Sequence, residues 1–271
     1  MSRFRDLHRR GNPLVLPNAW DFASGAALVD AGFAAVGTTS LGVAAAAGLP
    51  DGEGLVRAET IDLARKLSRL PVPVTVDVES GFGGGPDEVA ALALELVDAG
   101  AAGLNLEDSR PGGTLAEPAR QVELISAVKA AAPSLFLNAR VDTHWLGVAE
   151  DSTMDRVVRY AEAGADGVFV PGLPDSTAIR AVADAVELPL NVLYQPGRHT
   201  VAELADLGVC RISTGSLPFR VALHAGVRAA LAARDDASPG PAFSYPEVQA
   251  MTTRHSLRTT TPTTRSPGTN P

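Results

Sequence analysis

The sequence has a single cysteine and no long uninterrupted apolar run. Cys210 cannot form an intrachain disulfide, and its apolar surroundings predict a buried structural thiol. No apolar run approaches the roughly 20 residues that a membrane-spanning helix needs. The first ten residues are charged and lack the apolar core of a signal peptide. These absences predict a cytoplasmic protein in a reducing compartment.

Basic residues are also in short supply. The chain has 23 Lys and Arg against 31 Asp and Glu, which gives a net charge of −8. An acidic chain without a basic stripe argues against partners such as nucleic acids or anionic membranes. Of the 271 residues, 45% are hydrophobic, so one large core can form. An α/β barrel of about 250 residues fits this length as a single domain.

A short phrase recurs along the chain. Asp30–Val36 reads D-A-G-F-A-A-V, and related segments are Asp98–Leu104, Glu162–Val168 and, more loosely, Asp206–Val209. In each copy a glycine closes a helical pattern and an apolar strand follows within a few residues, as in an αβ connection. Strands that alternate with helices predict a parallel sheet with right-handed crossovers.

Eight apolar segments are predicted to be strands: Leu14–Leu16, Ala34–Gly37, Val74–Asp77, Gly103–Leu106, Leu135–Ala139, Gly167–Val170, Leu190–Val192 and Val209–Ile212. Amphipathic helices are expected between them, for example at Pro86–Ala99, Ala119–Ala131, Asp155–Ala163 and Thr177–Val186. Eight such units favour a (β/α)₈ TIM barrel over an open doubly wound sheet. A dinucleotide fingerprint is absent, because Pro86 stands where the third glycine would follow Gly81 and Gly83.

Composition changes near the C-terminus. The barrel domain is predicted to span residues 1–234 and to end with a helix at Leu223–Ala233. Residues 235–253 are expected to contain a linker and one short helix at Tyr245–Thr252. The Thr-, Pro- and Arg-rich residues 254–271 are predicted to be disordered.

The segment Val76–Gly84 carries the clearest chemical signal. Asp77 and Glu79 stand at alternate positions after an apolar run, so an extended strand would turn both carboxylates to one face. A glycine-rich loop follows and permits close approach of a ligand. Two carboxylates beside such a loop suit a magnesium-type cation, whereas the alternative is an acidic strand end that leads into a solvated loop.

In a barrel, active-site residues lie at the carboxyl ends of the strands. Polar or aromatic candidates at these positions are Asn18, Trp20, Asp21, Thr38, Thr39, Ser40, Asp51, Glu107, Asp108, Asn138, Arg140, Asp142, His144, Asn191, Tyr194, Gln195, Ser213, Thr214 and Ser216. Arg140 is suited to a bidentate grip on a substrate carboxylate, and a salt bridge to Asp142 or another acid is the alternative. Thr39, Ser40 and Gly42 offer hydroxyl and backbone donors, or form an ordinary polar turn. On residue type alone, Trp20 and Trp145 are expected to pack.

Taken in order, these residues resemble the isocitrate lyase / phosphoenolpyruvate mutase superfamily over Pro13–Ala233. The matching motifs are Leu16-Pro17-Asn18-Ala19-Trp20-Asp21, Thr38-Thr39-Ser40-Leu41-Gly42, Leu49-Pro50-Asp51, Val76-Asp77-Val78-Glu79-Ser80-Gly81-Phe82-Gly83, Leu106-Glu107-Asp108 and Asn138-Ala139-Arg140-Val141-Asp142. The resemblance implies a (β/α)₈ barrel whose last helix is exchanged between the subunits of a homodimer or homotetramer.

The resemblance also implies a cofactor and a set of site residues. Mg²⁺, with Mn²⁺ as an alternative, would be held largely through water by Asp77, Glu79 and Glu107, with Asp51 orienting substrate or ligated water. The substrate would be a small 2-oxo or 2-hydroxy carboxylate, or a phosphonate analogue. Its contacts would be Trp20, Thr39, Ser40, Leu41, Arg140 and Asn191, and of these Thr39, Ser40 and Arg140 are also assigned catalytic roles.

Two departures from the superfamily pattern narrow the activity. The loop Ser109–Glu117 lacks the cysteine that donates a proton in isocitrate and methylisocitrate lyases. Gly172 stands where those lyases carry a glutamate. The leading hypothesis is therefore a Mg²⁺-dependent lyase that acts through an enolate, by decarboxylation of an oxaloacetate-like acid or by aldol-type cleavage. The alternatives are P–C bond chemistry on a phosphonopyruvate-like acid, for which Thr114 is a weak match, and a catalytically silent anion-binding barrel.

Overall fold

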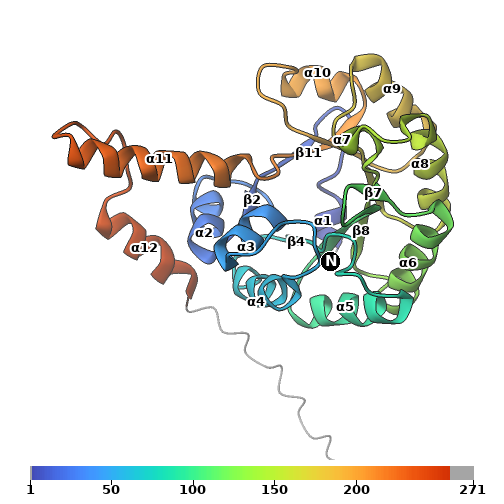
Figure 1. The fold of residues 1–271 in the computed structure, drawn as a ribbon, viewed down its shortest axis with the longest axis horizontal. Helices are drawn as coiled ribbons and strands as arrows, with labels where there is room; N and C mark the ends of the chain where they lie inside the picture. Colours follow the sequence, from blue (N-terminus) through green and yellow to red (C-terminus); the bar gives the residue numbers. More distant parts are fainter. Residues whose placement is uncertain (1, 257–271) are drawn as a thin grey trace, which may run out of the picture.

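The chain forms a nearly closed barrel of parallel strands with helices around it (Figure 1). The computed structural model describes residues 2–256. Around the barrel the strands follow the order β1 (Leu14–Leu16), β11 (Val209–Ser213), β10 (Leu190–Leu193), β9 (Gly167–Phe169), β8 (Phe136–Arg140), β5 (Gly103–Glu107), β4 (Val74–Asp77), β3 (Val36–Thr38) and β2 (Asn18–Ala19).

The first barrel strand is divided at Pro17, which has no backbone N–H for a ladder hydrogen bond. Its first half, β1, pairs in parallel with β11, and its second half, β2, pairs in parallel with β3. This change of partner brings the two edges of the sheet together. The predicted (β/α)₈ barrel is thus confirmed, and all eight predicted strands are present with ends that differ by no more than two residues.

Helices follow the strands as the repeated phrase predicts. The larger ones around the barrel are α2 (Phe22–Asp30), α3 (Ser40–Ala47), α4 (Arg57–Leu67), α5 (Pro86–Asp98), α6 (Pro118–Ala131), α8 (Thr153–Glu162), α9 (Ser176–Ala185) and α10 (Val201–Asp206). The glycines of the four repeats, Gly32, Gly100, Gly164 and Gly208, all have left-handed backbone with φ between 87° and 99°. Each ends a helix where a side chain would be strained.

The N-terminal end of the barrel is closed by α1 (Ser2–Arg5). Phe4 is buried and packs edge-on against Phe136, with 5.4 Å between ring centroids. His8 stacks on the same ring at 4.5 Å. Burial, followed by the charge of Arg211, lowers the pKa of His8 to about 3, so the imidazole is neutral. This end of the barrel is therefore a packed floor, and ligands must enter from the other end.

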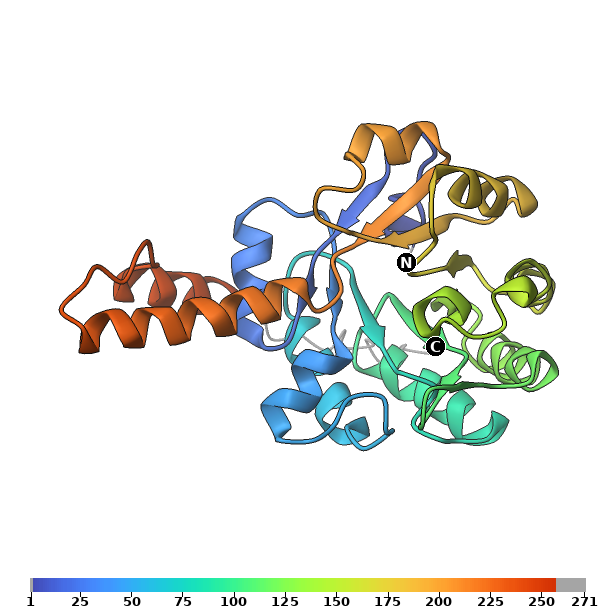
Figure 2. The same cartoon turned by 45° about the horizontal axis from the view of Figure 1, so that its top comes forward.

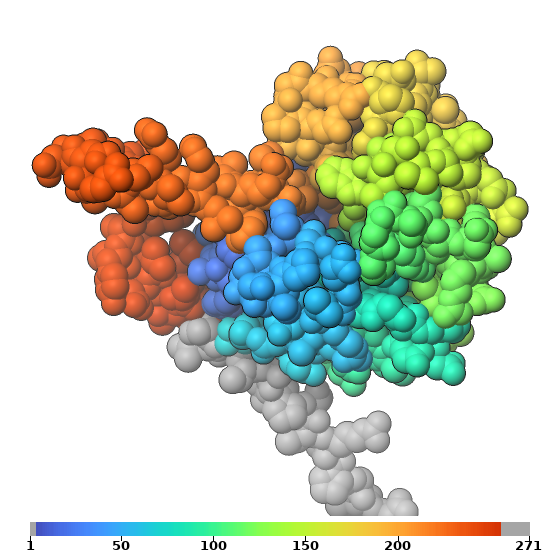
Figure 3. Space-filling model, in the orientation of Figure 1, coloured from blue at the N-terminus to red at the C-terminus, as the bar shows by residue number. Residues whose placement is uncertain are grey.

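The C-terminal helices leave the barrel. α11 (Leu217–Arg234) projects away from it, and α12 (Tyr245–Ser256) turns back alongside α2 (Figures 1 and 2). The space-filling view shows the same protrusion (Figure 3). Met251 of α12 is buried, and Arg254 and His255 both pair with Asp30 at 2.9 and 3.0 Å.

Two expectations for this region are corrected. The last barrel helix starts six residues before the predicted Leu223, and α12 extends beyond Thr252 through residues expected to begin a disordered tail. The pairing of Arg254 and His255 with Asp30 explains the extension. The remainder of the predicted tail, residues 257–271, lies outside the described residues. Within residues 2–256, every helix is too short or too polar to cross a bilayer.

Candidate active site

A cavity of about 370 Å³ opens at the carboxyl ends of the barrel strands. Its wall includes most of the residues predicted for the site: Thr39, Ser40, Leu41, Asp51, Asp77, Glu107 and Arg140. They come from segments that are far apart in sequence, and the parallel register of the strands gathers their ends. The size is ordinary for a small-molecule site.

The two acids of the Val76–Gly84 motif are placed differently from the expectation. β4 ends at Asp77, whose backbone N–H donates to Thr38 Oγ1 at 2.8 Å. Glu79 lies beyond the strand with φ of 50°, so strand alternation does not align the two carboxylates. Glu79 Oε2 accepts from the backbone of Gly54 at 2.8 Å, which ties the loop after Asp51 to this segment. The other carboxylate oxygen of Glu79 is buried without a hydrogen-bond partner among the described residues.

Arg140 ends β8 beside two acids. Its Nε donates to Asp142 Oδ1 at 2.6 Å, and its Nη1 lies 2.8 Å from Glu107 Oε2. Both ion pairs are largely buried. The salt-bridge alternative is therefore realised, and a substrate carboxylate would have to use the donors that remain on Nη1 and Nη2. Burial alone would lower the pKa of Arg140, but the charges of Asp142, Glu107 and Asp77 raise it, so the guanidinium stays charged.

The carboxylates are held in an environment that disfavours their charge. Burial, followed by the charge of Glu107, raises the pKa of Asp77 to about 7, while Arg140 opposes the shift. Burial also raises the pKa of Glu107 and of Glu79. Asp77 and Glu107 line the cavity, whereas Glu79, predicted as a metal ligand, is not among its lining residues. Acids with raised pKa values in a cavity are a common property of functional sites, because a cation or a proton is needed to balance them.

These acids are suited to a hydrated divalent cation. The donor set consists of hard carboxylate oxygens, and the buried free oxygen of Glu79 is a ligand atom without another use. Within residues 2–256, no three His, Cys, Asp or Glu side chains are close enough together to hold an ion directly. A cation here would keep several waters, which is the usual state of protein-bound Mg²⁺.

Backbone donors for an anion come from the start of α3. Thr39 is its N-cap residue, and the first intrahelical bond runs from the N–H of Val43 to the carbonyl of Thr39. The N–H groups of Ser40 and Leu41 therefore have no acceptor within the helix. Both residues line the cavity, and the helix dipole adds to their attraction for negative charge.

Two predicted substrate contacts are not brought into this cavity wall. Trp20 packs edge-on against Phe219, with 5.4 Å between ring centroids. Asn191 is 1% exposed and accepts a hydrogen bond from Ser213 Oγ at 3.1 Å, while its Nδ2 has no partner among the described residues. Asn191 therefore belongs to the polar layer beneath the cavity.

That layer contains a residue that sequence reasoning missed. Arg211 is completely buried in β11, where Nε donates to Ser213 Oγ and Nη2 to Asn105 Oδ1 at 3.0 and 3.3 Å. Burial lowers its pKa to about 9, and the charge of Asp77 opposes this shift. The signal was an arginine inside an apolar strand, two positions before Ser213 and therefore on the same strand face.

The loop that departs from the lyase pattern forms a small hairpin. β6 (Ser109–Arg110) pairs in antiparallel fashion with β7 (Thr114–Leu115), and Gly112 and Gly113 have left-handed φ values of 81° and 72°. Thr114 is exposed and lies opposite Arg110 in the hairpin. The loop contributes Ser109 and the residues up to Gly113 to the cavity wall.

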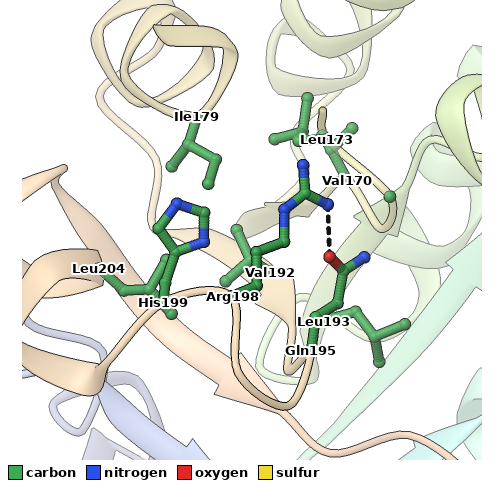
Figure 4. A pocket seen from close by; sticks show the side chains of 10 residues that line it. Val170, Leu173, Ile179, Val192, Leu193, Gln195, Arg198, His199 and Leu204 are labelled. Atoms are coloured by element: carbon green, nitrogen blue, oxygen red, sulfur yellow. Dashed lines mark hydrogen bonds between the residues drawn. The ribbon is translucent and has the colours of Figure 1, made fainter. Parts of the chain in front are cut away.

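A second, much smaller cavity of about 20 Å³ lies beside α9 and the loop after β10 (Figure 4). Leu193 lines both cavities, so its side chain is part of the wall between them. In the loop, Arg198 donates to the side chain of Gln195, and His199 lies 3.1 Å from Ser176 Oγ. This space holds little more than one water, and we assign it no ligand.

Asp108 was a site candidate, but it points away from the cavity. It is completely buried: Oδ2 accepts from Arg156 and Tyr160 at 2.9 and 2.8 Å, and Oδ1 accepts from the backbone of Asp142 at 2.8 Å. The last bond positions the segment that carries the partner of Arg140. Asp108 is thus a support of the site and not a part of its wall.

Replacing Asp108 with alanine is expected to lower the free energy of unfolding by about 3–5 kcal/mol, because it leaves a buried guanidinium without its partner. The exposed i,i+4 pair between Asp155 and Arg159 is the matched control, and Asp155→Ala should cost less than about 1 kcal/mol. Urea unfolding measures both. Equal losses in the two variants would contradict a supporting role for Asp108.

Comparisons with known proteins agree with this architecture. The family model of phosphoenolpyruvate phosphomutase matches residues 4–234. The chain is 43% identical over 260 residues to an uncharacterized protein of Mycobacterium tuberculosis, covering 95% of this chain and 99% of the relative. It is 31% identical over 228 residues to an oxaloacetate decarboxylase of Rhodopseudomonas palustris, covering 78% and 76%.

Among solved structures, a phosphonopyruvate hydrolase in complex with oxalate and Mg²⁺ superimposes with a TM-score of 0.83 at 21% identity, covering 95% of this chain and 96% of the other. At that identity the likeness concerns the fold. The family match over most of the folded chain and the 43% identical relative establish the family of this chain. The resemblance seen in the motifs is confirmed: this chain belongs to the phosphoenolpyruvate phosphomutase family, within the isocitrate lyase / phosphoenolpyruvate mutase superfamily.

Proposed function

We propose that the protein is a Mg²⁺-dependent lyase that cleaves a carbon–carbon bond next to a 2-oxo or 2-hydroxy carboxylate, through an enolate. The observation that carries the proposal is the meeting of Asp77, Glu107, Arg140 and the first N–H groups of α3 in one cavity. The oxaloacetate decarboxylase relative supports a small 2-oxo acid as substrate.

In the proposed reaction, a cationic side chain binds the substrate carboxylate and backbone N–H groups stabilise the enolate oxygen. Arg140 binds the substrate carboxylate through the N–H groups that Asp142 and Glu107 leave free. When the C3–C4 bond of the 2-oxo acid breaks, C4 leaves as CO₂ or as an aldehyde and the electron pair forms the C2–C3 enolate. The N–H groups of Ser40 and Leu41 stabilise the charge on the C2 oxygen, and water returns a proton to C3. Bound Mg²⁺, held by Asp77, Glu79 and Glu107 largely through water, would supply a Lewis acid and a template.

Calorimetric titration of oxalate, with and without Mg²⁺, tests the proposal. Oxalate is planar and doubly anionic and imitates a pyruvate enolate. Binding that requires Mg²⁺ is the expected result, and turnover of oxaloacetate, 2-hydroxy acids and phosphonopyruvate would then be assayed. Mn²⁺ is expected to replace Mg²⁺. Absence of oxalate binding in both conditions would contradict the proposed enolate site. Binding without any turnover would favour an anion-binding barrel.

We also propose that α11 is exchanged between the subunits of a homo-oligomer. Val221, Leu223 and Val227 on this projecting helix are 58%, 56% and 60% exposed, and a second subunit would cover them. Val227→Glu should shift the chain toward monomer in light scattering, whereas Val201→Glu on α10, at 46% exposure, should not. A wild-type monomer would rule out the exchange.

A further inference from the structure

The cavity has two unlike sides. On one side, Asp77 and Glu107 end β4 and β5, and the start of α3 follows β3. Strands β9 and β10 lie across the barrel from β3 and β4. The second side is built from α7 (Thr143–Leu146) and the ends of β9 and β10. Its lining side chains are Trp145, Leu146, Phe169, Pro171, Leu193 and Tyr194. We call these six residues the apolar wall.

The apolar wall adjoins the group that would bind the substrate carboxylate. The Arg140 guanidinium carbon lies 5.5 Å from the ring centroid of Phe169 and 5.9 Å from that of Trp145. These distances place both rings within cation–π range of the guanidinium. A substrate whose carboxylate binds Arg140 would therefore bring its carbon chain close to the two rings.

The backbone of Trp145 is held by close packing against a neighbouring loop, although its side chain is half-exposed. Gly172, in the loop after β9, has φ of 83°, and a Cβ there would lie 2.9 Å from the carbonyl oxygen of His144 and 3.3 Å from the N of Trp145. The loop and α7 thus pack backbone to backbone. Trp145 itself is 54% exposed at the cavity and has unused apolar surface. The glycine that replaces the lyase glutamate permits this arrangement.

The apolar wall offers no cation to a second carboxylate. In the part of the chain that the structure describes, all six of its side chains are uncharged. Arg110 lines the cavity outside the apolar wall, where its guanidinium is held by the carbonyl of Ser109 at 2.7 Å and by Gln121 Oε1 at 3.3 Å. Arg220, on α11 after β11, also lines the cavity, and a distal carboxylate that paired with it would leave the apolar wall unfilled. A charged distal group would lose solvation against this wall and gain no ion pair.

From these contacts we infer that the substrate is a 2-oxo acid whose C4 carries a hydroxyl and a branched-chain or aromatic group, and that the apolar group packs on the apolar wall. Aldol-type cleavage of the C3–C4 bond would release C4 as an apolar aldehyde, with the hydroxyl proton passing to water, and would leave the electron pair in the pyruvate enolate. The inference rests on the proposed enolate-forming function, because it takes the carboxylate end to be at Arg140. Trp145 and Phe169 are then specificity-determining residues, and Leu193 and Tyr194 complete the surface that excludes water from the apolar group.

Competition with oxalate in the presence of Mg²⁺ tests the preference for an apolar substrate separately from the proposed enolate-forming function. Phenylpyruvate and oxaloacetate are the probes: they share the 2-oxo carboxylate and differ in an aryl or an anionic distal group. Phenylpyruvate is expected to bind about 10-fold more tightly than oxaloacetate, or better. Tighter binding of oxaloacetate would overturn the inference and leave the proposed function intact. Failure of oxalate to bind would instead remove the proposed function.

Substitutions in the apolar wall test which side chains cause the expected preference for phenylpyruvate. Trp145→Ala should weaken phenylpyruvate binding about 10-fold and leave the dissociation constant of oxalate unchanged, because oxalate has no distal group. Tyr194→Ala should act in the same direction. Val148→Ala, in the same segment as Trp145 and 41% exposed, is the control that should change neither ligand. Equal weakening of oxalate and phenylpyruvate by Trp145→Ala would contradict a role limited to the distal group.

Discussion

Replacing Arg140 with methionine is expected to weaken Mg²⁺-dependent oxalate binding by about 100-fold or more, because a buried charged donor to the ligand is lost. It should also lower the free energy of unfolding at pH 8 by about 3–5 kcal/mol. The reason is local: Asp142 is completely buried, and its only ion-pair partner is this guanidinium among the described residues. Glu107, whose pKa burial already raises, loses the same partner.

The pH dependence of the stability loss in Arg140→Met shows whether the loss comes from charge or from packing. With Arg140 gone, the opposing charge that holds down the pKa values of Asp77 and Glu107 is removed, so both rise further. A carboxyl whose folded pKa is raised is more stable in its protonated form, and the destabilisation should therefore be smaller at pH 5 than at pH 8. Urea unfolding at both values measures this. A loss that is the same at both pH values would point to packing. Arg159→Met, in an exposed pair, is the control.

Much of the barrel could be predicted because local rules agree with the fold. Glycines such as Gly100 and Gly164 mark helix ends through a backbone conformation that depends on no distant contact. Apolar runs define the buried strands in the same local way. α3 was not predicted, because its Ala-rich sequence has no amphipathic pattern and its position is set by packing.

The candidate site was harder to predict from the sequence than the barrel, because the direction of a side chain depends on residues far away in sequence. Glu107 and Asp108 are neighbours, yet one lines the cavity and the other accepts from Arg156 and Tyr160 on α8. The alternation that aligned Asp77 with Glu79 ends with β4, since Glu79 adopts a left-handed backbone. Trp145 was expected to pack, and it lies half-exposed at the cavity because Gly172 permits α7 to approach.

The metal-free protein is expected to lose stability as the pH rises from about 4 to 7, and Mg²⁺ should reverse the loss. Burial and the charge of Glu107 raise the pKa of Asp77 to about 7, whereas an unfolded aspartate ionises near 3.9. Between these values the folded chain holds a proton that the unfolded chain has released. Stability therefore falls with rising pH, by up to about 1.4 kcal/mol per pH unit from this group.

Substitution of Asp77 by asparagine separates the proton from the metal. Asparagine does not titrate, so the slope between pH 4 and 7 should flatten, and the metal-free variant should be more stable than wild type at pH 8. Mg²⁺ at 100 times its dissociation constant should stabilise the wild type by about 2.7 kcal/mol and the variant by far less. Thermal unfolding with and without Mg²⁺ reads out both effects, and Asp62→Asn on α4, in an exposed pair with Lys66, is the control. A variant that keeps the full Mg²⁺ stabilisation would show that the cation binds elsewhere. A slope that survives the substitution would assign the titration to Glu107 or Glu79, whose pKa values are raised by the same burial.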